Sequence, residues 1–583
     1  MVKFMIENTV LREVGGDMTI EEAFAVWPNK AIVANIPAYF CRPSRDKKEI
    51  SGRFFRTAPD PELHVRTALE LAGSALLAML DPEKDHMPTD GYEEAHDLGR
   101  WWDAALRLEE MIGFVIPAEL EAASLRNLQR LTDNPDRLLM NRLDVPWLSG
   151  KAKINPHNFR ETLLAFGGLV RRRQSAWARE AGLQLVRAMD RCLRTDGSFD
   201  YTQLGCWGQA PYSDDPSHTQ TKRNGWFDST GSSGRSLEAL VWFFEATGEP
   251  LVLDVARRIA EHHLRFSTNK DGSVRAEIVN PENVGHNHSY HGTLRGLLRF
   301  GLLTGQKEYV DVVEATYRHA DHRRIVMESG WAPHDLGKPR FSNNHGDPGN
   351  EPSTTGDAAQ LALWLALEAG CLDLLDDVER YVRARILPAQ LTENDVRCNQ
   401  ERKFSRRECG SWGAYGPSHA GKGCIPDILA AVIHSLCDIY GHICTQTPVG
   451  IRVNLHFDYE DARLKITSLR NDCGLLSVLV KQPDNIMVRI PQWTPEASLK
   501  LSLDGQALPV QRLGSFAWIS CGILSAQSKI ELSYELPKKQ TEELMPSGRR
   551  YRFWWRGDEI IGVSPQDEPL PFYPDAIAAQ GDK

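Results

Sequence analysis

The architecture of this protein follows from two consecutive segments, SLEALVWFFEATG (residues 236–248) and EPLVLDVARRIAEHH (residues 249–263). The first segment is apolar almost all round, which is the pattern of a buried helix, and it stops at Gly248. The second segment carries Arg, Glu, Asp and His on one face, which is the pattern of a helix on the outside of a bundle. Together they predict an inner helix, a tight stop and an outer helix.

The same inner–outer pair returns twice further along the chain. TLRGLLRFGLLTG (residues 293–305) is followed by QKEYVDVVEATYRHA, and LALWLALEAG (residues 361–370) is followed by CLDLLDDVERYVRARIL. The inner helices end at Gly248, Gly305 and Gly370, a period of roughly 60 residues that indicates a helical-hairpin repeat. Alternating inner and outer helices at this period predict an (α/α)6 toroid, whose inner-helix ends surround a pocket.

Length and charge limit the class of protein. With 583 residues the chain is too long for one hydrophobic core, so we expect at least two domains. A net charge of −10 argues against nucleic acid or an anionic membrane as the main partner. Apolar runs stay below the ~18 residues that span a bilayer, and the first residues lack a signal-peptide pattern. The eleven cysteines lack the regular spacing of a disulfide framework. The composition predicts a cytoplasmic protein and is compatible with a homodimer.

The hydrophobic period changes along the chain and divides it into three parts. Residues 1–60 mix short apolar runs with Gly and Pro, and we expect an arm or strands that pack on a neighbouring domain. Residues 61–446 have the helical period and form the predicted (α/α)6 barrel. Residues 447–583 alternate apolar and polar positions between turn residues, which predicts a β-sandwich.

Long connections join the predicted helix pairs and are rich in Gly, Pro, Asn, His and Trp. They cover residues 196–233, 269–290, 329–355 and 394–422. Loops of this length inside a compact domain are usually functional. Their aromatic content is typical of a carbohydrate cleft, where flat rings stack on sugars, and the candidates for this role are Trp226, Trp331 and Trp412. A toroid followed by a sandwich is common among enzymes that act on polysaccharides, which is an analogy between folds.

Several segments resemble a known family. Residues 234–248 and 285–305 resemble the inner helices of glycoside hydrolase family 127, which includes the β-L-arabinofuranosidases. DGSFDY at residues 196–201 is similar to a turn of that family, and IPQW at residues 490–493 is similar to one of its sandwich strands. The resemblance covers roughly residues 155–565. It implies a helical barrel with an appended β-sandwich and hydrolysis of a glycoside such as an L-arabinofuranoside.

The catalytic residues of the family are not matched as well as its fold. Family members hold zinc with a Glu-x-Cys motif and a Cys-Cys pair, use one of the paired cysteines as nucleophile, and use an upstream Glu as acid/base. Those positions resemble residues 355–357 (Thr-Gly-Asp), 423–424 (Gly-Cys) and 339–340 (Pro-Arg) of this chain. A family histidine is replaced by Arg235, whereas the family's Gly-His survives with His286. We therefore expect no required cofactor. A zinc ion would need other ligands in place of those that the family uses, and Asp357 and Cys424 are the candidates.

Acidic residues in the loops are the alternative source of catalytic groups. Hydrolysis of a glycosidic bond needs a proton donor and a carboxylate that attacks or activates water. The loops offer Asp228, Asp335, Asp347, Glu351, Asp357 and Glu408. Asp357 is the first choice because it is expected to open an inner helix, although an N-cap would explain it equally well. Glu351 and Asp347 lie in HGDPGNEPS, where turn formation is the alternative explanation.

The densest group of polar rings is the stretch GHNHSYHG at residues 285–292. His286, His288 and Tyr290 are predicted to contact substrate there, together with Arg235 at the start of the preceding inner helix. Three functions follow from these residues. The first is a glycoside hydrolase that acts on a small glycoside or on the non-reducing end of an oligosaccharide. The second is a polysaccharide lyase that uses His or Tyr as the base of a β-elimination. The third is a sugar-binding protein without catalysis.

Overall fold

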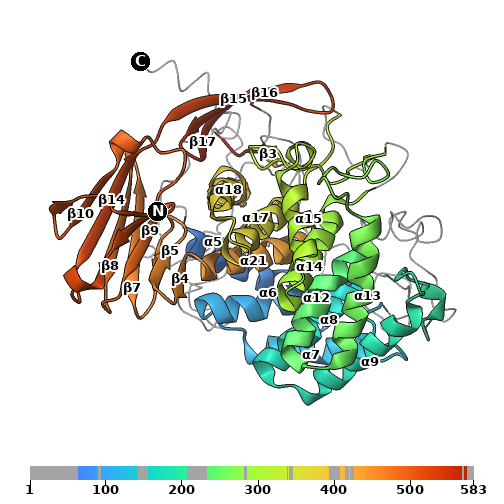
Figure 1. Ribbon diagram of the computed structural model, residues 1–583. Coiled ribbons are helices and arrows are strands. Elements are labelled where there is room, and N and C mark those ends of the chain that lie inside the picture. The colour runs from blue at the N-terminus through green and yellow to red at the C-terminus, as the bar shows by residue number, and fades with distance from the viewer. Residues whose placement is uncertain are drawn as a thin grey trace, which may run out of the picture.

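The computed structural model describes residues 64–88, 93–141, 155, 157–206, 233–280, 285–337, 339, 346–392, 408–413, 419–420, 426–566 and 570–573. The described chain is helix-rich from Val65 to Gly441, and its large sheets begin at Cys444. Helices and strands gather on different sides of the molecule (Figure 1), as the change of period predicts. The predicted arm at residues 1–60, together with Trp226, Asp228 and Cys424, lies outside the described residues.

Six helices in the described part of the chain form a closed cycle. Each packs on the next, and the last packs on the first. They are α6 (Glu94–Ile112), α8 (Asn158–Arg173), α12 (Ser233–Thr247), α14 (Asn287–Thr304), α17 (Pro352–Leu367) and α21 (Pro426–Gly441). These helices are buried over most of their surface, which is why their sequences are apolar or small nearly all round.

A second set of helices packs on the outside of this cycle. The set comprises α5 (Val65–Ala78), α7 (Ala118–Leu131), α9 (Ala176–Cys192), α13 (Pro250–Phe266), α15 (Lys307–Arg318) and α18 (Leu375–Tyr381). A π-helical turn, Val382–Ile386, continues α18 into α19 (Leu387–Ala389). Short elements are α16 (His322–Ile325), three-residue helices at Pro82–Lys84, Tyr201–Gln203 and Leu372–Leu374, and the strand pair β1 (Leu80–Asp81) and β2 (Met87–Pro88).

The predicted stops between inner and outer helices are confirmed. Gly248, Gly305 and Gly370 have φ values of 68°, 69° and 89°, a left-handed conformation that glycine adopts without steric cost. Glycines also let the inner helices approach closely. A Cβ at Gly296 of α14 would lie 2.7 Å from Leu237 Cβ of α12, and one at Gly99 of α6 would lie 2.8 Å from Glu161 Cβ of α8.

The C-terminal region forms two large sheets. The six-stranded sheet has the order β11 (Gln506–Leu508), β10 (Lys500–Leu503), β14 (Lys529–Glu535), β8 (Cys473–Val480), β7 (Leu464–Arg470), β6 (Tyr459–Glu460). The five-stranded sheet has the order β12 (Arg512–Leu513), β13 (Phe516–Ile519), β9 (Ile486–Arg489), β5 (Gly450–Val453), β4 (Cys444–Thr447). All neighbours in these sheets are antiparallel except β5 and β9.

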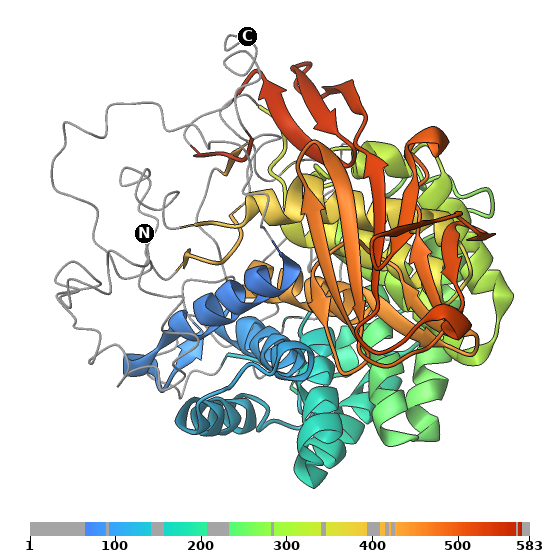
Figure 2. The same ribbon diagram turned by 90° about the vertical axis from the view of Figure 1, so that its left-hand side faces the viewer.

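Burial patterns show how these sheets face their surroundings. Strands β7, β8 and β14 bury alternate residues and so cover the core with one face only. All four residues of β9 are buried. Its Arg489 contacts Glu379 and Asp376 of α18, which places this sheet against the helices. Figure 2 shows the sheets in front of the helical part.

A separate three-stranded antiparallel sheet, β15 (Lys538–Leu544), β16 (Arg550–Arg556) and β17 (Glu559–Ser564), lies over one end of the helical part (Figures 1 and 2). Its alternating sequence predicted strands of the sandwich, but alternation identifies a half-buried strand without identifying its partners. A small pair, β18 (Leu570–Pro571) and β3 (His419–Ala420), lies nearby. No helix among the described residues is long and apolar enough to cross a membrane.

Candidate active site

Three backbone segments meet where the inner helices α14 and α17 begin. The amide of Asn287 donates to the carbonyl of His334 (2.9 Å), and the amide of His334 donates to the carbonyl of Gly349 (2.6 Å). The amide of Leu336 donates to the carbonyl of Gly285 (2.6 Å). These bonds bring two predicted site residues, His286 and Glu351, to the same end of the helical cycle.

His286, His334 and Glu351 form a compact polar group, called the Glu351 cluster below. Glu351 Oε2 lies 3.2 Å from His286 Nε2, and Glu351 Oε1 lies 2.9 Å from His334 Nε2. The side chains of His286, Glu351 and His334 are 11%, 12% and 13% exposed. Glu351 stands directly before α17, and its carboxylate turns to the histidines instead of capping the helix. The cluster is therefore partly accessible to solvent.

Opposite charges stabilise one another in this cluster. Burial alone would raise the pKa of Glu351, but the nearby positive charges of His334 and His286 hold it well below its usual value. Burial alone would lower the pKa of His334, but the charge of Glu351 and the hydrogen bonds to Asp335 and Glu351 raise it to about 9. At neutral pH the cluster thus holds a carboxylate beside an imidazolium.

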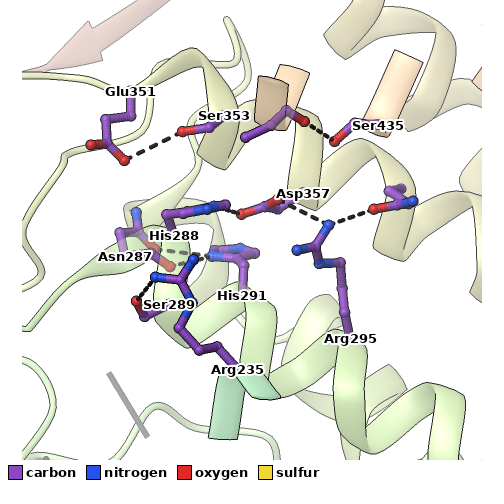
Figure 3. A network of polar contacts seen from close by, with 12 residues as sticks. Arg235, Asn287, His288, Ser289, His291, Arg295, Glu351, Ser353, Asp357 and Ser435 are labelled. Carbon is purple, nitrogen blue, oxygen red and sulfur yellow. Dashed lines mark hydrogen bonds and ion pairs between the residues drawn. The ribbon is translucent and has the colours of Figure 1, made fainter. Parts of the chain in front are cut away.

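A second polar group lies on the same two helices and is buried. Asp357 Oδ2 lies 2.5 Å from His288 Nδ1, and Asp357 Oδ1 lies 3.1 Å from a terminal guanidinium nitrogen of Arg295 (Figure 3). Arg100 of α6 lies 2.9 Å from the other ring nitrogen of His288. Burial raises the pKa of Asp357 although Arg295 opposes the shift. Asp357 is 1% exposed, so it sits within the helical core.

The expected position of Asp357 at the start of its helix is wrong. The helix α17 begins at Pro352, because proline with its fixed φ is well suited to the first helical position and the following residues continue the helix. Asp357 therefore lies inside the helix, beyond its first turn, and is not its N-cap. Glu351 occupies the position before the helix instead.

Arg235 connects the Glu351 cluster with the core. Its guanidinium donates to Glu161 Oε1 (2.6 Å) and lies 3.4 Å from Ser289 Oγ, which is itself 2.9 Å from His286 Nδ1. Figure 3 shows Arg235 pointing toward Ser289. The ring of His157 stacks on that of His286, with centroids 6.1 Å apart. Burial lowers the pKa of Arg235 to about 9, since Glu161 only partly offsets burial and the neighbouring cations.

The other predicted site residues among the described ones are buried. Trp331 and Trp412 are fully buried, and the indole of Trp412 donates to the carbonyl of Ile386 (2.7 Å). Burial raises the pKa of Tyr290, whose side chain is also fully buried. Asp347 is buried and accepts a hydrogen bond from the amide of Ser547 (3.2 Å).

Sequence reasoning missed His334 and His157. His334 is one of two histidines in the long loop at residues 329–355. It is followed by Asp335, whose Oδ1 lies 2.9 Å from its Nδ1. His157 directly precedes the inner helix α8, just as His286 precedes α14. A search for histidines immediately before inner helices would have found His157.

Comparison with known proteins places this geometry on a recognised scaffold. No protein-family model matches the chain, and no curated protein matches it. Among solved structures, it resembles a glycoside hydrolase, with a TM-score of 0.53, 13% identity, and 88% of this chain and 82% of the other covered. A GH127 β-L-arabinofuranosidase from Geobacillus stearothermophilus T6 gives a TM-score of 0.53 at 14% identity, with 93% and 84% covered. Another GH127 β-arabinofuranosidase gives a TM-score of 0.52 at 14% sequence identity, with 86% of this chain and 83% of the other chain covered. The chain shares the fold of these hydrolases.

The zinc site implied by the family resemblance does not fit the described residues at Asp357. The guanidinium of Arg295 already lies 3.1 Å from Asp357 Oδ1, and His288 lies beside Oδ2. A cation next to this guanidinium would be repelled by it. Asp357 is therefore neutralised by protein groups, and no chemistry is assigned to zinc at this position.

Proposed function

We propose that the chain is a glycoside hydrolase that acts on a small glycoside or on the non-reducing end of an oligosaccharide, at the Glu351 cluster. The proposed scaffold is an (α/α)6 toroid followed by a β-sandwich. An L-arabinofuranoside is the first substrate to test, because two solved structures with this fold are named as β-arabinofuranosidases.

The observation that carries the proposal is the placement of Glu351. Of the three carboxylates that the sequence analysis favoured, Asp347 and Asp357 are fully buried, whereas Glu351 is partly exposed. Glycoside hydrolysis needs a carboxylate near the anomeric carbon and a group that protonates the leaving oxygen. Glu351 provides the carboxylate, and His334, with its pKa of about 9, provides a proton within the same cluster.

The buried carboxylates take supporting roles in this proposal. Asp357 holds His288 and Arg295, and Asp347 holds the loop before Glu351 against the three-stranded sheet. Arg235 and Ser289 orient His286 from behind. These are positioning residues, because none of them is proposed to contact the substrate.

The placement of His288 and Tyr290 favours hydrolysis over β-elimination. A lyase would need one of them as a base in contact with a uronate. His288 is buried between Asp357 and Arg100, and Tyr290 is fully buried with a raised pKa. Neither has the exposure of the Glu351 cluster.

The test is a panel of nitrophenyl furanosides and pyranosides assayed with the wild-type protein and with Glu351→Gln. Glu351→Gln is expected to lower kcat/KM about 10²- to 10⁴-fold, with an unchanged circular dichroism spectrum. Glu308→Gln, an exposed substitution of the same type in α15, is the matched control and should retain full activity. Equal turnover by Glu351→Gln and the wild type would overturn the assignment. Formation of an unsaturated uronide would favour the lyase instead.

A further inference from the structure

The members of the Glu351 cluster are arranged so that a proton or a cation must lie between them. One atom each from His286, His334 and Glu351 can be chosen so that all three lie within 4.8 Å of one another. Each carboxylate oxygen faces an imidazole Nε2, at 3.2 Å and 2.9 Å. A lone pair on Nε2 would repel a carboxylate oxygen at these distances, so a proton or a metal ion must lie between them.

The second ring nitrogen of each imidazole, Nδ1, also has an oxygen partner. His334 Nδ1 lies 2.9 Å from Asp335 Oδ1, and His286 Nδ1 lies 2.9 Å from Ser289 Oγ. Metal-binding histidines characteristically have an oxygen partner on the second ring nitrogen, which fixes the ring and directs the first nitrogen to the ion. Both rings of the cluster show this pattern.

Spacing and charge are those of a transition-metal site. Ligand atoms around tetrahedral zinc, with bonds of about 2.0–2.1 Å, lie about 3.3 Å from one another. The distances from Glu351 to His286 and His334, 3.2 Å and 2.9 Å through different carboxylate oxygens, are close to this value. Glu351 and Asp335 together supply two carboxylates, enough to balance a divalent cation held by neutral imidazoles. Two histidines and one glutamate that leave a position open to solvent are a known ligand set for zinc.

We propose that His286 Nε2, His334 Nε2 and the Glu351 carboxylate bind a divalent transition-metal ion, with Zn²⁺ as the best-fitting ion. Its ligands differ from Asp357 and Cys424, the zinc-ligand candidates that the family resemblance suggested. The proposal rests on the contacts of the cluster and does not depend on glycoside hydrolysis. In the metal-free protein, Glu351 and His334 form the catalytic pair proposed above. When the ion binds, it takes the place of the protons between Glu351 and the histidines, and Glu351 acts as a ligand, so bound Zn²⁺ is expected to lower turnover.

The experiment is a Zn²⁺ titration of the full-length protein after treatment with a chelator, followed by calorimetry and by competition with a chromophoric chelator. One equivalent is expected to bind to the wild type. His334→Gln and Glu351→Gln should each weaken binding by at least about 100-fold, and Asp335→Asn, which removes the support of His334, by ~10–100-fold. His319→Ala, which lies outside the cluster in the turn before α16, should bind as the wild type does.

Circular dichroism of each variant identifies any loss of binding that comes from unfolding, and Co²⁺ provides an independent readout. Co²⁺ bound by the wild type should show the intense visible bands of a four- or five-coordinate site, and these bands should disappear in folded Glu351→Gln. Substoichiometric Zn²⁺ binding by the wild type, or equal affinity in all variants, would overturn the proposal. Binding is measured without substrate, so its failure is separate from failure of the hydrolase assay. Higher turnover with Zn²⁺ would support the metal site and would overturn the use of Glu351 as a free carboxylate.

Discussion

Glu543 in β15 accepts two hydrogen bonds from Ser329, one from its amide and one from its hydroxyl, each 2.7 Å long. Ser329 belongs to the loop that leads to His334 and Glu351. A carboxyl group of the C-terminal region therefore fixes a loop of the helical region.

This contact predicts a pH-dependent stability. Burial raises the pKa of Glu543 from 4.5 to about 7, although the bonds from Ser329 lower it. The folded protein keeps a proton on Glu543 that the unfolded chain releases near pH 4.5. The stabilisation is thus present below the unfolded pKa and is lost as pH rises through about 7. Urea unfolding across this range should show that the wild type loses up to about 3 kcal/mol relative to Glu543→Gln. Parallel pH profiles of the two proteins would contradict this.

Asp357→Asn is predicted to destabilise the helical core. The substitution removes the charge that faces Arg295 and His288, and breaking a buried ion pair costs about 3–5 kcal/mol. Differential scanning calorimetry should show a clear decrease in Tm. The control is Asp373→Asn, which removes an exposed pair with Arg318 and should cost no more than about 1 kcal/mol. Similar decreases in Tm in both variants would show that the buried ion pair of Asp357 stabilises the protein no more than an exposed one.

Arg489→Met is predicted to weaken the contact between the helices and the sheets. Arg489 is buried and pairs with Glu379 and Asp376 of α18. Its removal takes away a positive charge that balances these two carboxylates. The expected loss is about 3 kcal/mol, and calorimetry should show separate transitions for the two regions. Arg512→Ala removes an exposed pair with Glu496 and serves as the comparison. A single transition with unchanged Tm in Arg489→Met would rule out this role.

Gly296→Ala is predicted to disturb the contact between α14 and α12. The added Cβ would lie 2.7 Å from Leu237 Cβ and 3.1 Å from the backbone nitrogen of Glu238. Overpacking of this kind costs about 1–3 kcal/mol, more than the gain of about 1 kcal/mol from helix propensity. In Gly167→Ala of α8 the nearest atom lies at 3.8 Å, so stability should rise. Chemical unfolding of both variants measures the difference, and a stabilised Gly296→Ala would disprove the close contact.

The local features of the fold were predictable because single residues encode them. Gly248, Gly305 and Gly370 end helices in a conformation that few other residues adopt. The contact between α21 and α6, which closes the cycle, joins residues more than 300 positions apart in sequence and has no local signal. The assignment of β16 and β17 to a separate sheet was not predictable either, because alternation identifies a half-buried strand without identifying the sheet that it joins.

The candidate site was predictable in part. His286 and Glu351 were found because each stands in a long loop directly before an inner helix. His334 was missed because one loop histidine carries no sign of its neighbours. Trp331 and Trp412 were chosen as loop aromatics, yet a ring that packs under a loop has the same sequence pattern as one that faces a ligand.

The contacts of Ser329 with Glu543 and of Asp347 with Ser547 have a consequence for any exchange of the C-terminal region. A C-terminal region taken from another protein of this fold would have to supply a carboxyl group at the place of Glu543 and a backbone amide at the place of Ser547 to hold the loop that carries His334. The helical and C-terminal regions therefore depend on each other at this loop. A chimera joined near residue 447 would need matching changes in that loop before it could preserve the original specificity.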